Sequence, residues 1–180
     1  MGLGFSAYKW QSDLGAVGGD FSLQSKGGPI QLRDFRGKVV VLYFGYRYCP
    51  DVCPTTLSSL ASMKKQLTKQ EQNSLKVVFI SVDPDRDTPK ILDDYVKFFD
   101  KGFIGVTGSK TEIVNVAKNF GIAYKIHPPK DSKDPENYLV DHTSYALIIG
   151  KDGLIRDAIE HNEPINLGTM KIRKYIQEKI

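Results

Sequence analysis

The chain has 180 residues, which is enough for one domain that buries a sizeable core without disulfide staples. Its 25 basic and 21 acidic residues leave a net charge of +4, and no block of five or more like charges occurs. This balance argues against a nucleic-acid-binding tail, so we expect no nucleic-acid partner.

The N-terminal residues 1–17 have few apolar positions at a regular period, and we expect an irregular arm there, followed by one domain over residues 18–180. No apolar run approaches the ~18 residues that span a bilayer. The first six residues, Met-Gly-Leu-Gly-Phe-Ser, fit a myristoylation pattern. A start methionine and linker joined to a trimmed domain would look the same, and we favour that interpretation.

The first half of the domain alternates strand and helix patterns. Residues 21–23 and 30–32 alternate apolar and polar side chains around a Gly-Gly-Pro turn, which predicts a β-hairpin. The continuous apolar run over residues 39–44 is typical of a central strand with a parallel neighbour. Leucines at helical spacing behind Pro54 predict a helix of about four turns after Cys53.

The β-α-β-α order continues beyond this helix. Residues 75–82 form a second buried strand pattern, and the Thr-Pro pair after it predicts the start of a helix over residues 89–99. A short strand over residues 103–106 precedes a third helix, which a capping box of Ser109 and Glu112 begins.

Two hairpins and a helix complete the chain. Residues 124–126 and 138–140 flank a polar loop rich in lysine, aspartate and proline, which is typical of an exposed insertion. Residues 145–149 and 154–159 enclose a Gly-Lys-Asp-Gly turn and predict a closing hairpin. The last helix, over residues 167–180, places its methionine and its isoleucines near one apolar side.

The only two cysteines, Cys49 and Cys53, lie four residues apart between the first buried strand and its helix. One helical turn brings such thiols to one face, so they can form an intramolecular disulfide under mild oxidation or share one metal ion. The spacing does not choose between these uses. Burial as two structural thiols is the third alternative. We disfavour it because a proline-flanked loop is a poor place to bury a thiol, and because helix N-termini activate thiolates.

Three separated stretches, in this order, resemble the signature motifs of the SCO/SenC family of copper-binding cytochrome c oxidase assembly proteins. They are Gly45-Tyr46 with Cys-Pro-Asp-Val-Cys-Pro at 49–54, Ser-Val-Asp-Pro-Asp-Arg-Asp-Thr-Pro at 81–89, and Asp-His-Thr-Ser at 141–144. The element order also looks like an α/β, thioredoxin-like fold with an N-terminal hairpin and an inserted hairpin before the final strands. The resemblance implies that Cys49, Cys53 and His142 bind copper, as Cu(I) or Cu(II).

One departure from the family pattern lies beside the first cysteine. Arg47-Tyr48 stands where many members carry Thr-His. That histidine is not a core ligand, so the departure bears on partner choice or redox tuning and not on copper binding.

The chemistry of these residues agrees with the resemblance. Two thiolates and an imidazole form a soft set that suits Cu(I) and can also hold Cu(II). Zinc is the strongest rival, but it would want a fourth ligand, and nothing nearby resembles a zinc hydrolase or dehydrogenase motif. His127 and His161 lie among polar residues, where we expect solvated side chains, so His142 is the preferred ligand.

Several charged residues flank the motifs. Arg47 would stabilise thiolates, whereas Asp51 could cap the helix or oppose thiolate formation. Asp83, Asp85 and Asp87 resemble part of a hard-cation site, but their alternation with other residues before Pro89 favours a capping loop.

Three functions remain open. The first is a metallochaperone that passes one copper by ligand exchange to the binuclear copper site of cytochrome c oxidase subunit II or to another acceptor. The second is a thiol-disulfide oxidoreductase in which Cys49 and Cys53 reduce the cysteines of that site. The third is a thiol peroxidase, which we disfavour because a proline-rich loop with a threonine before the reactive cysteine is absent. Apart from dithiol exchange, we therefore expect no enzymatic activity.

The resemblance also implies a location and partners. The family works outside the cytoplasm, in the bacterial periplasm or, alternatively, in the mitochondrial intermembrane space. We prefer the periplasm, with a membrane tether that is missing from this chain. Another copper chaperone or a thiol reductant is a further expected partner.

Overall fold

The computed structural model describes residues 18–179 of the chain. Three of the predicted features lie wholly or partly outside these residues. They are the N-terminal arm, the myristoylation pattern and the last residue of the final helix. Within the described range, no helix is both long and apolar enough to cross a membrane.

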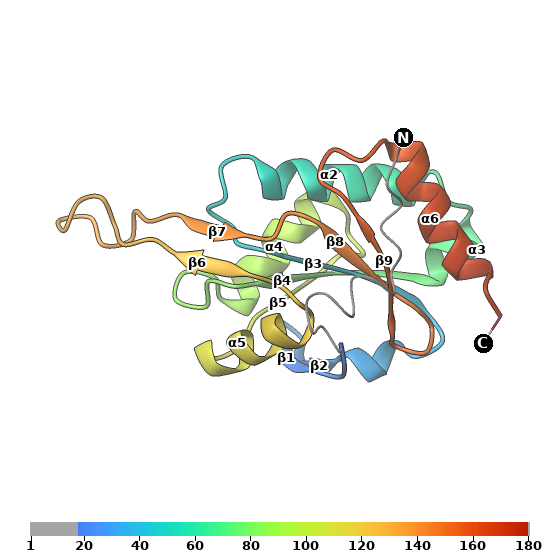
Figure 1. Cartoon of the computed structure of the whole chain (residues 1–180), viewed down its shortest axis with the longest axis horizontal. Helices are drawn as coiled ribbons and strands as arrows, with labels where there is room; N and C mark the ends of the chain where they lie inside the picture. The colour runs from blue at the N-terminus through green and yellow to red at the C-terminus, as the bar shows by residue number, and fades with distance from the viewer. Residues whose placement is uncertain (1–17, 180) are drawn as a thin grey trace.

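A five-stranded sheet with the order β5-β4-β3-β8-β9 forms the centre of the molecule (Figure 1). Strand β3 (Val39–Gly45) lies in the middle and is buried throughout. It pairs in parallel with β4 (Leu75–Ser81) and antiparallel with β8 (Ala146–Ile149). The edge strands are β5 (Ile104–Val106) and β9 (Ile155–Ile159). The predicted central position of the first apolar run is confirmed, and one of its two neighbours is parallel.

Layers of helix cover both faces of this sheet. Successive side chains of a strand point to opposite faces, so an entirely apolar strand such as β3 has apolar side chains on both faces, and both need to be covered. Val39, Val41 and Tyr43 face a cluster with residues of α2 (Val52–Lys65), α4 (Pro89–Phe99) and α6 (Ile165–Gln177). The alternate residues of β3 face a second cluster on the other side. That side carries α5 (Lys110–Asn119), the hairpin β1 (Ser22–Ser25) and β2 (Gly28–Gln31), and the short 3-10 helix η1 (Leu32–Phe35). Figure 1 shows α2 and α6 on one side of the sheet and α5 with the β1–β2 hairpin on the other.

The predicted helix starts are confirmed by their hydrogen bonds. The hydroxyl of Thr88 accepts from the backbone N–H of Ile91 at the start of α4. Ser109 and Glu112 form the predicted capping box of α5. The same kind of box begins the short helix α3 (Lys69–Asn73), which was not predicted. No residue of α3 is buried, so no apolar period revealed it.

The inserted hairpin consists of β6 (Tyr124–Ile126) and β7 (Val140–His142), which pair only with each other and project from the body of the molecule (Figure 1). Strand β7 was predicted to begin at residue 138 and begins two residues later, at Val140. Tyr138 stays outside the ladder, and its carbonyl accepts a hydrogen bond from Arg86 instead. As a result, His142 belongs to a strand, where it lies opposite Tyr124.

The final helix buries Ile172, Tyr175 and Ile176 as predicted, but it differs from the prediction at Met170. Met170, which we expected near the apolar side, is 61% exposed. Gly168 and Thr169 are buried in its place. A Cβ atom on Gly168 would lie 2.4 Å from Cε of Met63, so this helix approaches α2 through a residue without a side chain.

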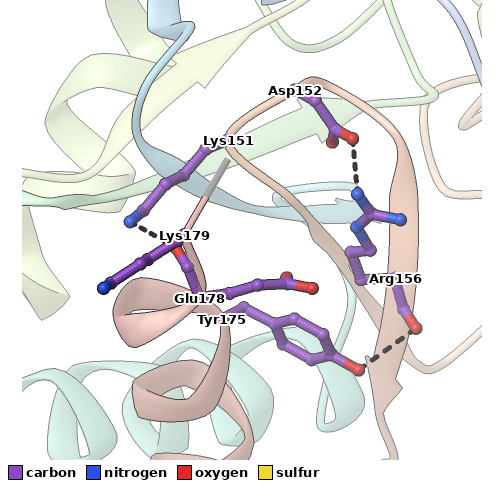
Figure 2. A pocket seen from close by; sticks show the side chains of 6 residues that line it. All are labelled: Lys151, Asp152, Arg156, Tyr175, Glu178 and Lys179. Atoms are coloured by element: carbon purple, nitrogen blue, oxygen red, sulfur yellow. Dashed lines mark hydrogen bonds and ion pairs between the residues drawn. The ribbon is translucent and has the colours of Figure 1, made fainter.

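A small pocket of about 160 Å³ lies where the β8–β9 turn meets the end of α6 (Figure 2). Asp152 and Arg156 form an ion pair in it, and Lys151 donates to the carbonyl of Glu178 over 2.8 Å. The hydroxyl of Tyr175 donates to the carbonyl of Arg156 over 3.4 Å. None of the predicted site residues lines this pocket, and its contacts tie the last helix to the sheet edge.

Candidate metal centre

The two cysteines occupy different environments at the end of β3. Cys53 lies in the first turn of α2 and is fully buried, whereas Cys49 lies in the loop before the helix and is half-buried. The expectation that this loop cannot bury a thiol is therefore wrong for Cys53. The reason is Gly45, where a Cβ atom would lie 2.5 Å from the sulfur of Cys53. The missing side chain leaves room for that sulfur beneath the sheet.

The sulfur of Cys49 caps the helix. It accepts a hydrogen bond from the backbone N–H of Cys53 over 3.4 Å. Asp51 stands at the N-cap position, but its side chain makes no capping bond and accepts from Thr55 Oγ1 over 3.2 Å instead. The sulfur thus takes the place that an oxygen usually fills at a helix N-terminus. Capping by the Asp51 carboxylate, one of our two alternatives for this residue, is not observed.

The surroundings push the pKa values of the two thiols in opposite directions. A hydrogen bond from the Cys53 side chain, with further help from two backbone N–H groups, lowers the pKa of Cys49 to about 4, against the opposing effect of burial. Burial raises the pKa of Cys53, and the neighbouring Cys49 adds to that rise. The pair therefore combines a thiolate that reaches the surface with a buried thiol.

His142 on β7 completes the group. Its Nε2 atom lies 3.3 Å from the sulfur of Cys53. Its Nδ1 atom lies 2.9 Å from the carbonyl oxygen of Thr143, which can only accept, so Nδ1 carries the proton and Nε2 presents its lone pair. The rings of Tyr43 and Tyr46 stand edge-on to the imidazole, with centroids 6.3 and 5.8 Å away. These contacts fix the imidazole with its free nitrogen towards the sulfurs.

The ligand atoms of Cys49, Cys53 and His142 all lie within 4.8 Å of one another. Across residues 18–179, this is the only cluster of three or more histidine, cysteine or acidic side chains with metal-binding spacing. A pocket of about 440 Å³ opens onto Cys49 and His142 between the cysteine loop and the hairpin. Cys53 does not line it. An ion that enters from solvent would thus meet Cys49 and His142 before the buried sulfur.

The other two histidines do not reach this group. His127 Nε2 lies 2.6 Å from a carboxylate oxygen of Asp141, and His161 Nδ1 lies 3.2 Å from Oγ1 of Thr56. Both side chains are partly exposed, as expected, but each has a protein partner.

Arg47, expected to stabilise thiolates, is instead engaged elsewhere. Its guanidinium lies 3.6 Å from Asp87 and 4.0 Å from the ring centroid of Tyr48. The largest contributions to the lowered pKa of Cys49 come from other groups.

The three aspartates of the loop after β4 have separate partners. Asp83 pairs with Arg86 over 2.6 Å, and Asp85 pairs with Lys110 over 2.7 Å. Asp87 is buried and accepts from the hydroxyl of Ser81 over 2.6 Å. The carboxylates do not converge, which fits the preferred loop interpretation and not a hard-cation site.

The fold and the Cys-Cys-His group together define a class: thioredoxin-like α/β proteins with two thiols and an imidazole at the end of the central strand. The family model described as SCO1/SenC matches residues 10–177. The chain therefore belongs to the SCO1/SenC family, as the sequence motifs indicated.

Relatives of known sequence and structure agree with this assignment. The mitochondrial protein SCO2 of Saccharomyces cerevisiae is 36% identical over 163 residues, which cover 90% of this chain and 54% of the relative. A SCO2-like protein of Rickettsia conorii is 40% identical over 139 residues, covering 76% of this chain and 66% of the relative. The chain thus spans between about half and two thirds of the length of these relatives.

Two solved structures have the same fold. Yeast Sco1 with copper bound superposes with a TM-score of 0.81 at 30% identity, covering 92% of this chain and 91% of the other. Arabidopsis thaliana ScoI with copper bound also gives 0.81, at 34% identity, covering 91% of this chain and the whole of the other.

Proposed function

We propose that this chain carries copper, binding one ion through Cys49, Cys53 and His142 and passing it to a copper site of cytochrome c oxidase. The observation that carries the proposal is the convergence of two sulfurs and a free imidazole nitrogen within 4.8 Å. Two soft sulfurs and one nitrogen match the preference of copper, and the relatives with similar structures include copper-bound Sco proteins.

The donor set favours copper over zinc. Zinc sites usually have four ligands, or three and a water. Asp141, the acidic residue next to His142 in sequence, has its carboxylate engaged by His127. No fourth histidine, cysteine or acidic side chain joins the group among the described residues.

The geometry also suits release of the ion by ligand exchange. Cys49 and His142 line an open pocket, whereas Cys53 lies behind them. An acceptor thiolate can approach through the pocket and replace the accessible ligands one at a time, while the buried sulfur keeps hold of the ion. The Thr143 carbonyl holds the imidazole orientation throughout.

A second function, thiol-disulfide exchange, is favoured by the asymmetry of the cysteines. Cys49 is partly exposed and Cys53 lies buried directly behind it, so one thiol can attack a target disulfide and the other can resolve the mixed disulfide. In this role the chain would reduce the cysteines of the oxidase copper site and be reduced in turn by a thiol reductant.

Mild oxidation is expected to join Cys49 and Cys53 within one chain. Their sulfurs belong to a group whose ligand atoms lie within 4.8 Å of one another, and cysteines one helical turn apart have Cα atoms about 6 Å apart, which a disulfide can span. Mass spectrometry of the oxidised protein should show the loss of two hydrogens without a covalent dimer. A mainly intermolecular product would contradict the arrangement described above.

Replacing His142 with alanine separates the two functions. The variant should lose Cu(II) binding and bind Cu(I) more weakly, because two thiolates alone tend to reduce Cu(II) and leave Cu(I) with one ligand fewer. Disulfide exchange should stay near the wild-type rate, because Cys49 keeps its hydrogen bonds from Cys53. The measurements are anaerobic copper titration with absorption spectra, disulfide exchange with a model substrate, and oxidase assembly in a strain that carries the variant.

His127→Ala is the matched control, since His127 lies on the same hairpin outside the group. It should bind one copper per chain as the wild type does. Normal oxidase assembly with His142→Ala, together with failed assembly in cysteine variants, would overturn the carrier proposal and leave thiol reduction as the function.

We further propose that residues 18–180 act as one domain outside the cytoplasm. The preferred compartment is the bacterial periplasm, with the mitochondrial intermembrane space as the alternative. Relatives of both bacterial and mitochondrial origin support either location. The proposed acceptor is cytochrome c oxidase subunit II, and the proposed donor is a second copper chaperone. A membrane tether outside this sequence would hold the domain near both.

A further inference from the structure

Arg86 lies where three separate segments of the chain meet. It belongs to the loop after β4, and its side chain is only 6% exposed. Its Nε atom lies 2.6 Å from the carboxylate of Asp83 in the same loop. Its Nη1 atom donates to the carbonyls of Glu136 and Tyr138, over 2.7 and 3.0 Å, in the inserted hairpin. One guanidinium therefore bonds the hairpin to the body of the protein.

The same guanidinium makes cation–π contacts with three tyrosine rings. The centroid of Tyr138 is 3.5 Å away, that of Tyr48 4.7 Å and that of Tyr46 5.7 Å. Tyr138 belongs to the hairpin, whereas Tyr46 and Tyr48 belong to the loop that leads to Cys49. Arg86 thus contacts both segments that supply the metal-binding group.

The hairpin needs such a connection. Strands β6 and β7 form a separate two-stranded sheet with a register of three residue pairs, and isolated hairpins of this size are marginally stable in water. Yet β7 must present His142 to a sulfur fixed in the core. Asp83 reinforces the connection, because it accepts a hydrogen bond from the hydroxyl of Tyr138 over 2.6 Å as well as the ion pair from Arg86.

We propose that Arg86 is a positioning residue that holds the hairpin bearing His142 against the loop bearing Cys49. It thereby sets the distance between the imidazole and the two sulfurs. The inference rests on the proposed copper-carrying function. An arginine suits this role because its planar fork bonds a carboxylate and carbonyls at its edge while its face stacks on rings, which a lysine cannot do.

The test compares Arg86→Lys with wild-type protein in two measurements. Copper(II) titration should show about ten- to hundredfold weaker binding, the usual cost of losing a group that orients a metal ligand. Hydrogen exchange of the metal-free protein should show faster exchange of the backbone amides of β6 and β7. Arg173→Lys is the matched control, because Arg173 forms an ion pair with Glu71 between α6 and α3 and has no contact with the hairpin. This control should change neither measurement.

A second variant keeps the test decisive if Arg86→Lys folds poorly. Tyr138→Leu removes the nearest ring but leaves the buried ion pair of Asp83 and Arg86 intact, and it should produce the same two changes. Wild-type copper affinity and wild-type exchange in both variants would overturn the inference while leaving the proposed function in place. If the wild-type protein binds no copper at all, the proposed function fails, and hydrogen exchange alone shows whether Arg86 holds the hairpin.

Discussion

Substituting serine for either cysteine is expected to abolish tight copper binding. One thiolate and one imidazole would remain, and a serine hydroxyl is a poor ligand for a soft ion. The affinity should fall by more than the roughly 10–100-fold that the loss of an outer-shell group costs. Anaerobic Cu(I) titration against a chromophoric chelator measures the change. Retention of full affinity in either variant would rule out the three-ligand site.

The two serine variants should differ in stability. Cys49→Ser keeps an acceptor at the start of α2 in a partly exposed position, so the free energy of unfolding should change little. Cys53→Ser replaces a fully buried sulfur in an apolar cluster with a more polar hydroxyl, which we expect to cost about 1 kcal/mol even with His142 Nε2 as its partner. Urea unfolding of the metal-free proteins distinguishes the two. Equal stability would show that Cys53 is less enclosed than the structure indicates.

Gly45→Ala is expected to damage both the core and the metal-binding group. The added Cβ atom would lie 2.5 Å from the sulfur of Cys53 and 2.9 Å from the ring of Phe79, and both side chains are fully buried. Overpacking of this kind typically costs about 1–3 kcal/mol. The sulfur would be displaced, so copper affinity should fall together with the free energy of unfolding. Urea unfolding and copper titration of the same samples measure the two effects.

Gly27→Ala is the matched control for this substitution. Gly27 lies in the turn between β1 and β2, and the nearest atom to an added Cβ is the Ser25 hydroxyl oxygen at 3.8 Å. Neither stability nor copper affinity should fall in this variant. If Gly45→Ala behaves like Gly27→Ala, then Gly45 does not set the position of Cys53.

Local patterns predicted most of the scaffold from the sequence. The apolar run of β3, the Thr88-Pro89 start of α4 and the Ser109 capping box each depend on residues close in sequence, and all three are found in the structure. The part of the α6 contact around Gly168 could not be predicted in this way. It depends on the close approach of Gly168 to Met63, a contact between distant parts of the chain.

The metal-binding group was predicted in its members but not in its geometry. The motifs indicated Cys49, Cys53 and His142, and the structure brings them together. The unequal burial of the two sulfurs depends on the space that Gly45 leaves, which no local pattern reveals. The contacts of Arg86 were also missed, because their partners lie 50 and 52 residues away in the hairpin. The position of Arg86 within the motif at 81–89 was the only available signal.

The structure shows the contacts of Arg47 and Tyr48, the pair that stands where many family members carry Thr-His. The Tyr48 ring contacts two guanidinium groups, with Arg47 at 4.0 Å and Arg86 at 4.7 Å from its centroid. It is also 49% exposed. A rigid, partly exposed aromatic ring next to Cys49 is a suitable contact for a docking protein. An influence of this pair on partner choice stays a prediction.

The metal-binding group is divided between the core of the fold and an insertion that has its own two-stranded sheet. Both sulfurs are anchored at the end of the central strand, whereas the imidazole comes from an insertion whose two strands pair only with each other. The Cys53 sulfur and the imidazole come from positions 89 residues apart. Swinging the insertion aside would open the ligand set without unfolding the core. Under the proposed copper-carrying function, loading and release of the ion would then require movement of one hairpin and not of the core.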